Sequence, residues 1–314
     1  MLGPSGVEVS RVILGCGNFG GIGSAPAFFG AGETEAEAHA LLDAAWEAGV
    51  TTYDTADAYG GGRSESYIGS WLQTKGPEVR ERIVLTTKTF NPMADGADQG
   101  LSPARVRRQL ESSLQRLGVE AVDLYLAHAM DSETPLAETF GAFAELLDAG
   151  KIRAYGGSNV DADWIREALR CGAPACVQNS FSLLDRDDEQ EVLPLCASEG
   201  IAYVPFGPLA GGWLTGKYRR GEEPPAGSRM TLRPEPYRHL DDGRVYDAIE
   251  ALEDRARERG TDAAALAIGW LLSHPHVTAV VTGPRRPEQL RPALQALELD
   301  LSPPEHEQLA GVFA

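Results

Sequence analysis

The chain has 314 residues, a mass of 33.6 kDa and a formal net charge of -18. An acidic chain without a long Lys/Arg cluster is poorly suited to bind a polyanion, so we expect no nucleic-acid partner. No basic segment precedes a long apolar run, and no stretch of about 18 apolar residues occurs, which predicts a soluble, cytoplasmic protein without a membrane partner. The cysteines lack metal-ligand spacing, so we expect no metal. The oligomeric state stays open.

Short apolar, β-branched runs alternate with helical patterns along the whole chain. The predicted strands lie at residues 12–16, 51–54, 83–88, 124–128, 154–158, 175–179, 202–206 and 277–281. The predicted helices lie at 33–48, 64–73, 102–117, 136–149, 163–170, 189–199, 245–259, 262–273, 287–297 and 303–313. Strands and helices in this number and order close a (β/α)8 barrel, so we predict an α/β fold of the TIM-barrel class, with residues 1–314 as one domain.

One long segment does not belong to this alternation. Residues 207–240 are rich in Gly, Pro and Arg, and no strand-helix unit needs so long a connection for its own closure. Long connections of this kind are usually functional, so we expect the insertion at about 207–240 to have a function of its own.

A doubly wound open sheet is the alternative fold, because Gly15, Gly17 and Gly20 follow the first strand with the spacing of a phosphate-binding loop. A lone match to this spacing is weak. No clear helix begins at Gly20, and Pro26 interrupts the region where that helix should run. We therefore interpret these glycines as a tight loop at the barrel mouth.

Ionisable side chains stand at the ends of three successive predicted strands. Asp54 ends the strand at 51–54 and Tyr59 lies on the loop after it, while Lys88 and His128 end the next two strands. The carboxyl ends of barrel strands meet at one face, where such barrels keep their chemistry. We expect these four residues to form the catalytic site.

The chain resembles the aldo-keto reductase superfamily along nearly its whole length, and four segments carry the resemblance. Residues 54–60 match the Asp-Thr-Ala-x-x-Tyr-Gly pattern, and residues 146–159 are similar to the family's central motif. Residues 208–218 are similar to the loop that folds over the cofactor, and residues 283–290 to the segment that holds the adenosine phosphate.

The resemblance implies reversible, metal-free hydride transfer between NADPH and a carbonyl. Tyr59 would be the general acid that protonates the carbonyl oxygen. The ammonium of Lys88 would lower the pKa of this phenol from its usual value of about 10, and Asp54 would hold Lys88 in place. His128 would orient the carbonyl.

The same resemblance implies a set of cofactor contacts. Ser158, Asn159 and Gln178 would hydrogen-bond the nicotinamide carboxamide. The complete predicted set is Ser158, Asn159, Gln178, Phe206, Gly207, Pro208, Leu209, Gly211, Lys217, Arg229, Gly283, Arg285 and Gln289. Lys217 and Arg229, which lie in the insertion rich in Gly and Pro, would reach the cofactor phosphates. Arg285 or its neighbour Arg286 would pair with the 2′-phosphate of NADPH.

Three positions depart from the family pattern. Phe206 stands where a ring-stacking Tyr is usual, Gly207 where Ser is common, and Ala293 where an Asn contacts adenine. Loss of these polar contacts puts the preference for NADPH over NADH in question, so NADPH is the expected cofactor and NADH is possible.

The expected function is reduction of small aldehydes or ketones, and the resemblance leaves two alternatives. The loop at 59–65 is similar to that of several sugar dehydrogenases, which favours oxidation of a sugar or alcohol as one alternative. Some relatives bind cofactor but serve a partner protein, so a cofactor-binding regulatory subunit is the other. A metal-dependent barrel enzyme is disfavoured because its ligands are lacking. The physiological substrate and the direction of the reaction stay open.

Overall fold

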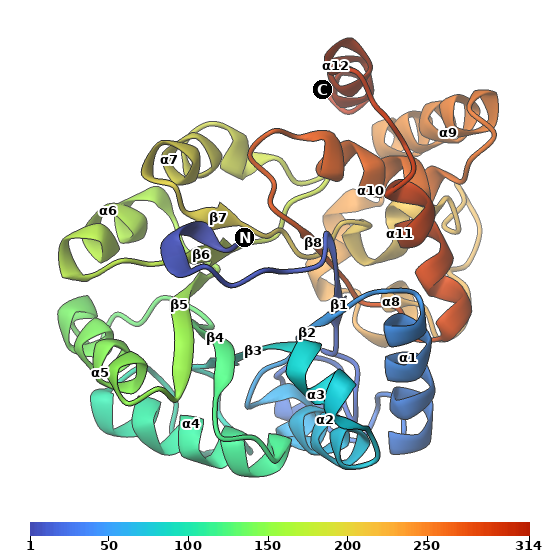
Figure 1. Ribbon diagram of the computed structural model, residues 1–314. Helices are drawn as coiled ribbons and strands as arrows, with labels where there is room; N and C mark the ends of the chain where they lie inside the picture. The colour runs from blue at the N-terminus through green and yellow to red at the C-terminus, as the bar shows by residue number, and fades with distance from the viewer.

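Eight parallel strands form the sheet of the computed structural model, which describes residues 1–314 (Figure 1). Their bounds are β1 Val12–Gly15, β2 Thr52–Asp54, β3 Val84–Thr89, β4 Val122–Ala127, β5 Ile152–Ser158, β6 Cys176–Gln178, β7 Ala202–Tyr203 and β8 Val280–Thr282. Neighbours in the chain are neighbours in the sheet, and β1 also pairs with β8. This order is the one that the alternating pattern predicts.

The two ends of the sheet meet through single bridges. Tyr203 pairs with Val277, and Phe206 pairs with Val281. The predicted strands at 202–206 and 277–281 are therefore present, although regular pairing is confined to shorter stretches. The prediction of a (β/α)8 barrel is confirmed.

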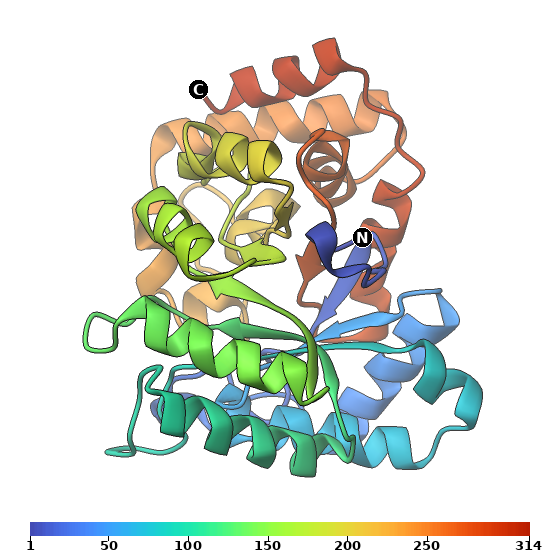
Figure 2. The same cartoon turned by 60° about the vertical axis from the view of Figure 1, so that its left-hand side comes forward.

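Helices surround the strands, as predicted. They are α1 Glu35–Glu47, α2 Arg63–Gln73, α3 Pro77–Arg82, α4 Pro103–Leu117, α5 Leu136–Asp148, α6 Ala162–Cys171, α7 Val192–Glu199, α8 Arg229–Leu232, α9 Gly243–Glu258, α10 Ala263–Ser273, α11 Arg291–Ala296 and α12 Pro303–Val312. Figure 2 shows α4 and α5 lying against each other on the outside of the barrel. None of these helices has the length and apolar character needed to cross a membrane.

Four helical segments differ from the prediction. The short helices α3 and α8 were not predicted, because six and four residues are too few to show a helical period. The helix predicted at 189–199 begins only at Val192, after a 3-10 turn at Asp187–Glu189. The segment predicted as a helix at 287–297 opens with the 3-10 turn Pro287–Leu290, so α11 begins only at Arg291.

The barrel interior is filled by branched and small side chains. In β4, Leu124 and Leu126 point inward, while Tyr125 between them points toward the helices and donates to the carbonyl of Val106. This alternation follows from the two-residue period of a strand. Leu2 from the N-terminal segment packs into the same interior cluster. Since the centre is packed, any ligand must bind at a mouth of the barrel.

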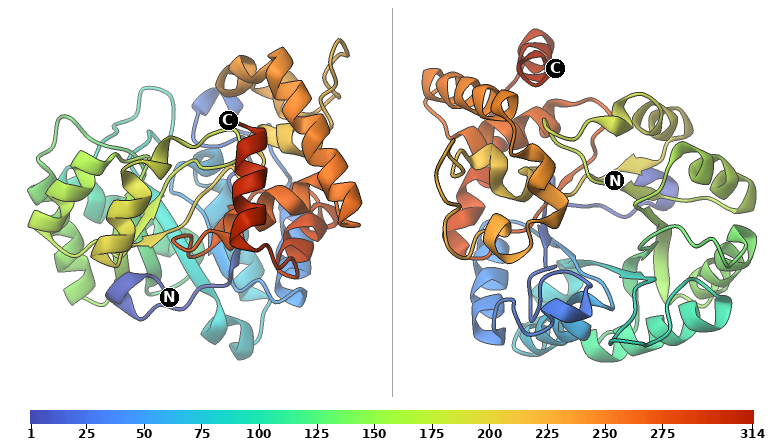
Figure 3. Two further views of the ribbon diagram at one scale, coloured as in Figure 1. Left: turned by 90° about the horizontal axis from the view of Figure 1, so that it is seen from above. Right: turned by 180° about the vertical axis from the view of Figure 1, so that it is seen from behind.

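The insertion lies at the mouth opposite the N-terminal segment (Figure 3). It folds into two 3-10 segments, Ala210–Thr215 and Glu235–Leu240, with α8 between them. The loop after β1 reaches the same mouth, and Gly20 within it adopts a φ of 67° and starts no helix. This agrees with the interpretation of these glycines as a loop rather than an open-sheet phosphate motif.

Candidate active site

The four predicted catalytic residues lie together at the strand ends. Asp54 is the last residue of β2, and Tyr59 begins a 3-10 turn just beyond it. Lys88 lies in β3, one residue before the strand end, and His128 directly follows β4. Asp54, Tyr59 and His128 line a common cavity, while Lys88 is buried behind them.

Lys88 is the cationic centre of this group. Its Nζ lies 2.5 Å from Oδ1 of Asp54, 2.9 Å from the carbonyl oxygen of Thr55 and 5.2 Å from the ring centroid of Tyr59. Burial acts to lower the pKa of Lys88, but the charge of Asp54 and its hydrogen bond are the main influences that raise it, and the net pKa lies above the ordinary value. Lys88 is therefore an ammonium at neutral pH.

The direction of the Tyr59 pKa shift differs from the one that the sequence predicts. Burial is the largest influence and raises the pKa of the phenol, while the nearby charge of Lys88 lowers it only in part. The net pKa lies above the ordinary value, because desolvation of the phenolate outweighs the favourable charge. Tyr59 thus keeps its proton at neutral pH, as a general acid must.

His128 connects the phenol to the rest of the site. Its Nε2 lies 3.5 Å from the Tyr59 hydroxyl, and its Nδ1 lies 3.2 Å from the amide nitrogen of Asn91. Burial and the charge of Lys88 lower the pKa of His128 to about 3, so the ring is neutral. Asn91 was not among the predicted residues, since nothing in its loop sequence signals this contact.

Two of the residues predicted to hold the nicotinamide carboxamide form hydrogen bonds with predicted catalytic residues. Nε2 of Gln178 donates to Oδ2 of Asp54 at 2.9 Å, and Nδ2 of Asn159 donates to the carbonyl of His128 at 2.9 Å. The same Nδ2 donates to Oγ of Ser158 at 3.1 Å. Asn159 has a φ of 56°, in the left-handed region that Asn tolerates better than most residues. Oε1 of Gln178 has no partner in this network.

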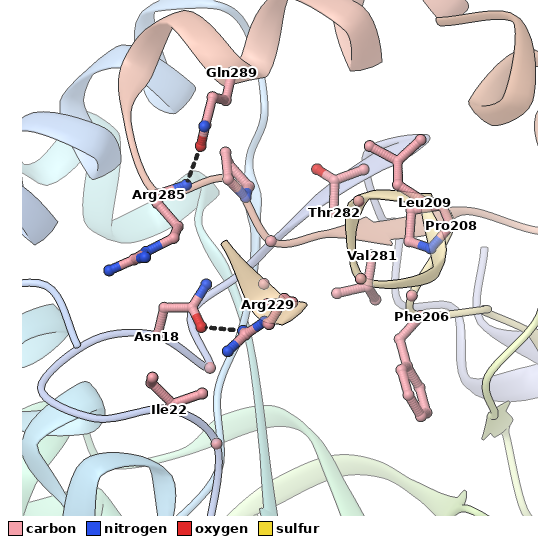
Figure 4. A pocket seen from close by; sticks show the side chains of 18 of the residues that line it. Asn18, Ile22, Phe206, Pro208, Leu209, Arg229, Val281, Thr282, Arg285 and Gln289 are labelled. Carbon is pink, nitrogen blue, oxygen red and sulfur yellow. Dashed lines mark hydrogen bonds between the residues drawn. The ribbon is translucent and has the colours of Figure 1, made fainter. Parts of the chain in front are cut away.

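A cavity of about 1050 Å³ runs from these residues to the insertion. Every predicted cofactor-contact residue lines it, namely Ser158, Asn159, Gln178, Phe206, Gly207, Pro208, Leu209, Gly211, Lys217, Arg229, Gly283, Arg285 and Gln289. Figure 4 shows several of these residues around the cavity. Segments far apart in the chain thus form one continuous wall.

Five cationic residues line this cavity, and three of them, Lys217, Arg229 and Arg285, lie close together. Arg229 donates to Oδ1 of the neutral Asn18 (Figure 4), and Arg285 pairs with Glu33. Burial lowers the pKa of Lys217, and the charges of Arg229 and Arg285 lower it further, because all three cations lie close together. A cluster of cations in an acidic chain is suited to bind an anionic ligand such as a diphosphate.

Two local features support this cationic wall. A Cβ at residue 212 would lie 2.4 Å from Nζ of Lys217, so Gly212 leaves room for the ammonium. The backbone N–H of Arg285 donates to Oε1 of Gln289 at 2.8 Å, which fixes the start of the 3-10 turn Pro287–Leu290 (Figure 4). The side-chain amides of Asn159 and Gln178 lie at one end of the cavity, and the cations lie along its wall. This arrangement suits a dinucleotide.

Comparison with known proteins agrees with this arrangement. The model of the Aldo/keto reductase family matches residues 11–313. The chain therefore belongs to the aldo/keto reductase family, whose members are oxidoreductases that use nicotinamide cofactors.

Similar proteins extend along nearly the full chain. An uncharacterized oxidoreductase of Bacillus subtilis (strain 168), YrpG, is 35% identical over 99% of this chain and 94% of its own length. An NADH-specific methylglyoxal reductase of Escherichia coli (strain K12) is 34% identical over 96% of this chain and 94% of its own length. The structure of a glycerol dehydrogenase from Gluconobacter oxydans matches with a TM-score of 0.84 and 26% identity, over 99% of this chain and 93% of that one.

Proposed function

We propose that this protein reduces small aldehydes or ketones to alcohols with a reduced nicotinamide dinucleotide, and that NADPH is accepted as this cofactor. The observation that carries the proposal is the hydroxyl of Tyr59, which lies on the cavity wall 3.5 Å from Nε2 of His128. Proton donation to a carbonyl oxygen needs a neutral acid beside a polar anchor. Tyr59 and His128 supply these two groups.

Each residue of the site would have its own role in the reaction. The bound cofactor would supply the hydride. Tyr59 would give its proton to the carbonyl oxygen as negative charge develops there, and the ammonium of Lys88 would stabilise the phenolate that remains. Asp54 would keep Lys88 charged and fixed. His128 would donate a hydrogen bond from Nε2 to the same carbonyl oxygen and so orient it.

In the proposed binding mode, different parts of the cavity wall contact the two halves of the cofactor. Ser158, Asn159 and Gln178 would contact the carboxamide, and Phe206 would stack on the nicotinamide ring. Lys217 and Arg229 would contact the diphosphate, since their charges are not paired with carboxylates. Arg285 and Gln289 would then lie beside the adenosine.

A second candidate is oxidation of an alcohol or sugar by the same residues in reverse. The likeness to a glycerol dehydrogenase over 99% of the chain favours it. Tyr59 would then act as a phenolate base, which its raised pKa disfavours near neutral pH.

One experiment tests both directions. In the first assay, the protein is incubated with NADPH or NADH and a panel of aldehydes and ketones that includes methylglyoxal. In the second, it is incubated with NADP+ or NAD+ and with glycerol or sugars. The absorbance of the reduced cofactor is followed in both. We expect turnover with carbonyls to exceed turnover with alcohols at neutral pH. Tight cofactor binding without turnover in either direction would contradict the proposal and favour a regulatory role.

A further inference from the structure

Glu33 is a buried acid on the cavity wall for which the proposed reaction gives no role. It lies between β1 and α1, is 5% exposed and pairs with Phe19 through a backbone bridge. Its Oε1 accepts a hydrogen bond from Nε of Arg285, and its Oε2 has no hydrogen-bond partner. A buried carboxylate oxygen without a partner is costly, so a ligand that donates to it would be bound favourably.

The surroundings of Glu33 indicate which part of a dinucleotide it would meet. Arg285 and Arg286 precede the 3-10 turn Pro287–Leu290 and line the cavity beside Glu33 and Glu37. The carboxamide contacts and Tyr59 come instead from the ends of other strands. The end of the cavity at Glu33 is therefore the adenosine end in the proposed binding mode.

We propose that Glu33 sets the choice between NAD(H) and NADP(H). The adenosine ribose carries a 2′-hydroxyl in NAD(H) and a 2′-phosphate in NADP(H). A ribose 2′-hydroxyl can donate to the free Oε2. A 2′-phosphate offers almost only acceptor oxygens and a charge of about −1.5 to −2 at neutral pH, so it would be repelled by the same carboxylate. Glu33 also engages Arg285, the cation that would otherwise be free to bind the phosphate. Glu33 thus lowers the affinity for NADP(H) relative to NAD(H).

The neighbouring acid offers a matched control. Glu37 lines the same cavity, one helical turn from Glu33, but its Oε2 accepts from the backbone N–H of Thr34 at 2.8 Å and from its hydroxyl at 2.7 Å. This capping box directs the Glu37 carboxylate toward the helix end. Glu37→Gln removes the same charge and retains the groups of the cap.

The test measures dissociation constants of NAD+ and NADP+ for the unaltered protein, Glu33→Gln and Glu37→Gln. We expect Glu33→Gln to shift the ratio of the two constants toward NADP+ by roughly tenfold or more, since like charges side by side strongly weaken binding. Glu37→Gln should shift it by no more than about twofold, because its charge is exposed and screened. A ratio unchanged within about twofold in Glu33→Gln would overturn the inference.

A measurement on the unaltered protein keeps the inference testable if Glu33→Gln does not fold. The NAD+ analogue with 2′-deoxyadenosine lacks the hydroxyl that Oε2 would accept. It should bind about fivefold or more weakly than NAD+, as expected when a hydrogen bond to a charged group is lost. Equal affinity for the analogue and NAD+ would contradict the proposed contact.

The inference rests on the proposed function only in requiring that the cavity bind a nicotinamide dinucleotide. If the unaltered protein binds neither NAD+ nor NADP+, the proposed function fails together with the inference. If both cofactors bind and support turnover while the ratio does not respond to Glu33→Gln, only the role of Glu33 is wrong.

Discussion

The side-chain nitrogen of Asn91 lies 3.2 Å from Nδ1 of His128. An amide NH2 group can only donate, so Nδ1 accepts and the single hydrogen of the neutral ring is on Nε2, which faces Tyr59. Arg105, 2% exposed, donates to the backbone carbonyl of Asn91 at 2.7 Å and holds this loop in place. Asn91, which is not one of the four predicted catalytic residues, thus sets the tautomer of His128 that can donate to a substrate.

Asn91→Asp should reverse this arrangement. A carboxylate would accept from Nδ1–H, raise the pKa of His128 from about 3 and remove the hydrogen from Nε2 in the neutral ring. We expect kcat/KM for carbonyl reduction to fall by roughly tenfold or more, with cofactor affinity retained. Nitrogen chemical shifts of His128 report the tautomer directly, and Asn91→Leu is the control that removes the donor without adding charge. Unchanged shifts in Asn91→Asp would contradict the assignment.

Tyr59→Phe should abolish reduction because it deletes the proton donor and keeps the ring. The loss in kcat/KM should be about 100-fold or more. Cofactor affinity, measured by fluorescence titration, should stay nearly the same, since the hydroxyl faces His128 rather than the cationic wall. A variant rate within about tenfold of the unaltered protein would show that another group donates the proton.

The pH profile should follow the raised pKa of Tyr59. The neutral acid that reduction needs is depleted only as pH rises through that pKa, so kcat/KM should stay level through neutral pH and fall only in the alkaline range. Oxidation should gain in the same range. Lys88→Met removes the charge that partly lowers the pKa of Tyr59. The fall of reduction and the gain of oxidation should therefore both move to higher pH. Profiles of the two directions with identical pH dependence would exclude Tyr59 as the shared acid and base.

Asp57 should make the stability of the protein depend on pH. Its carboxylate is fully buried, Oδ2 accepts from the hydroxyl of Thr89, and Oδ1 has no partner. Burial, and then the charge of Glu65, raise the pKa to about 7 in the folded state, against about 4 in the unfolded chain. The folded state therefore binds more protons between these values, and the stability contributed by Asp57 is lost as pH rises from about 4 to about 7.

Asp57→Asn should remove this dependence. The free energy of unfolding of the unaltered protein, minus that of the variant, should fall by up to about 4 kcal/mol between pH of about 4 and about 8. Urea unfolding at both pH values measures this difference. If it stays constant, the folded pKa of Asp57 is not raised.

The sequence predicted the parts of the molecule that local patterns encode. The β-branched runs located the strands, and the strand ends carried Asp54, Tyr59, Lys88 and His128. Two contacts escaped prediction because their partners are distant in the chain, Asn91 with His128 at a separation of 37 residues and Glu33 with Arg285 at 252. The direction of the Tyr59 pKa shift was wrong because local sequence does not show how far a phenol is desolvated.

Arg229 and Arg285 line the cavity and also fasten the insertion. Arg229, at the start of α8, bonds to Asn18 in the loop after β1, and Arg285 donates to the carbonyl of Gly227 at 3.0 Å. A diphosphate that engages Arg229 would compete for the hydrogens that hold residues 207–240 against the loop after β1. In the proposed binding mode, loading and unloading of the cofactor would be coupled to opening of residues 207–240, so we expect the exchange of spent for fresh cofactor to limit the turnover rate.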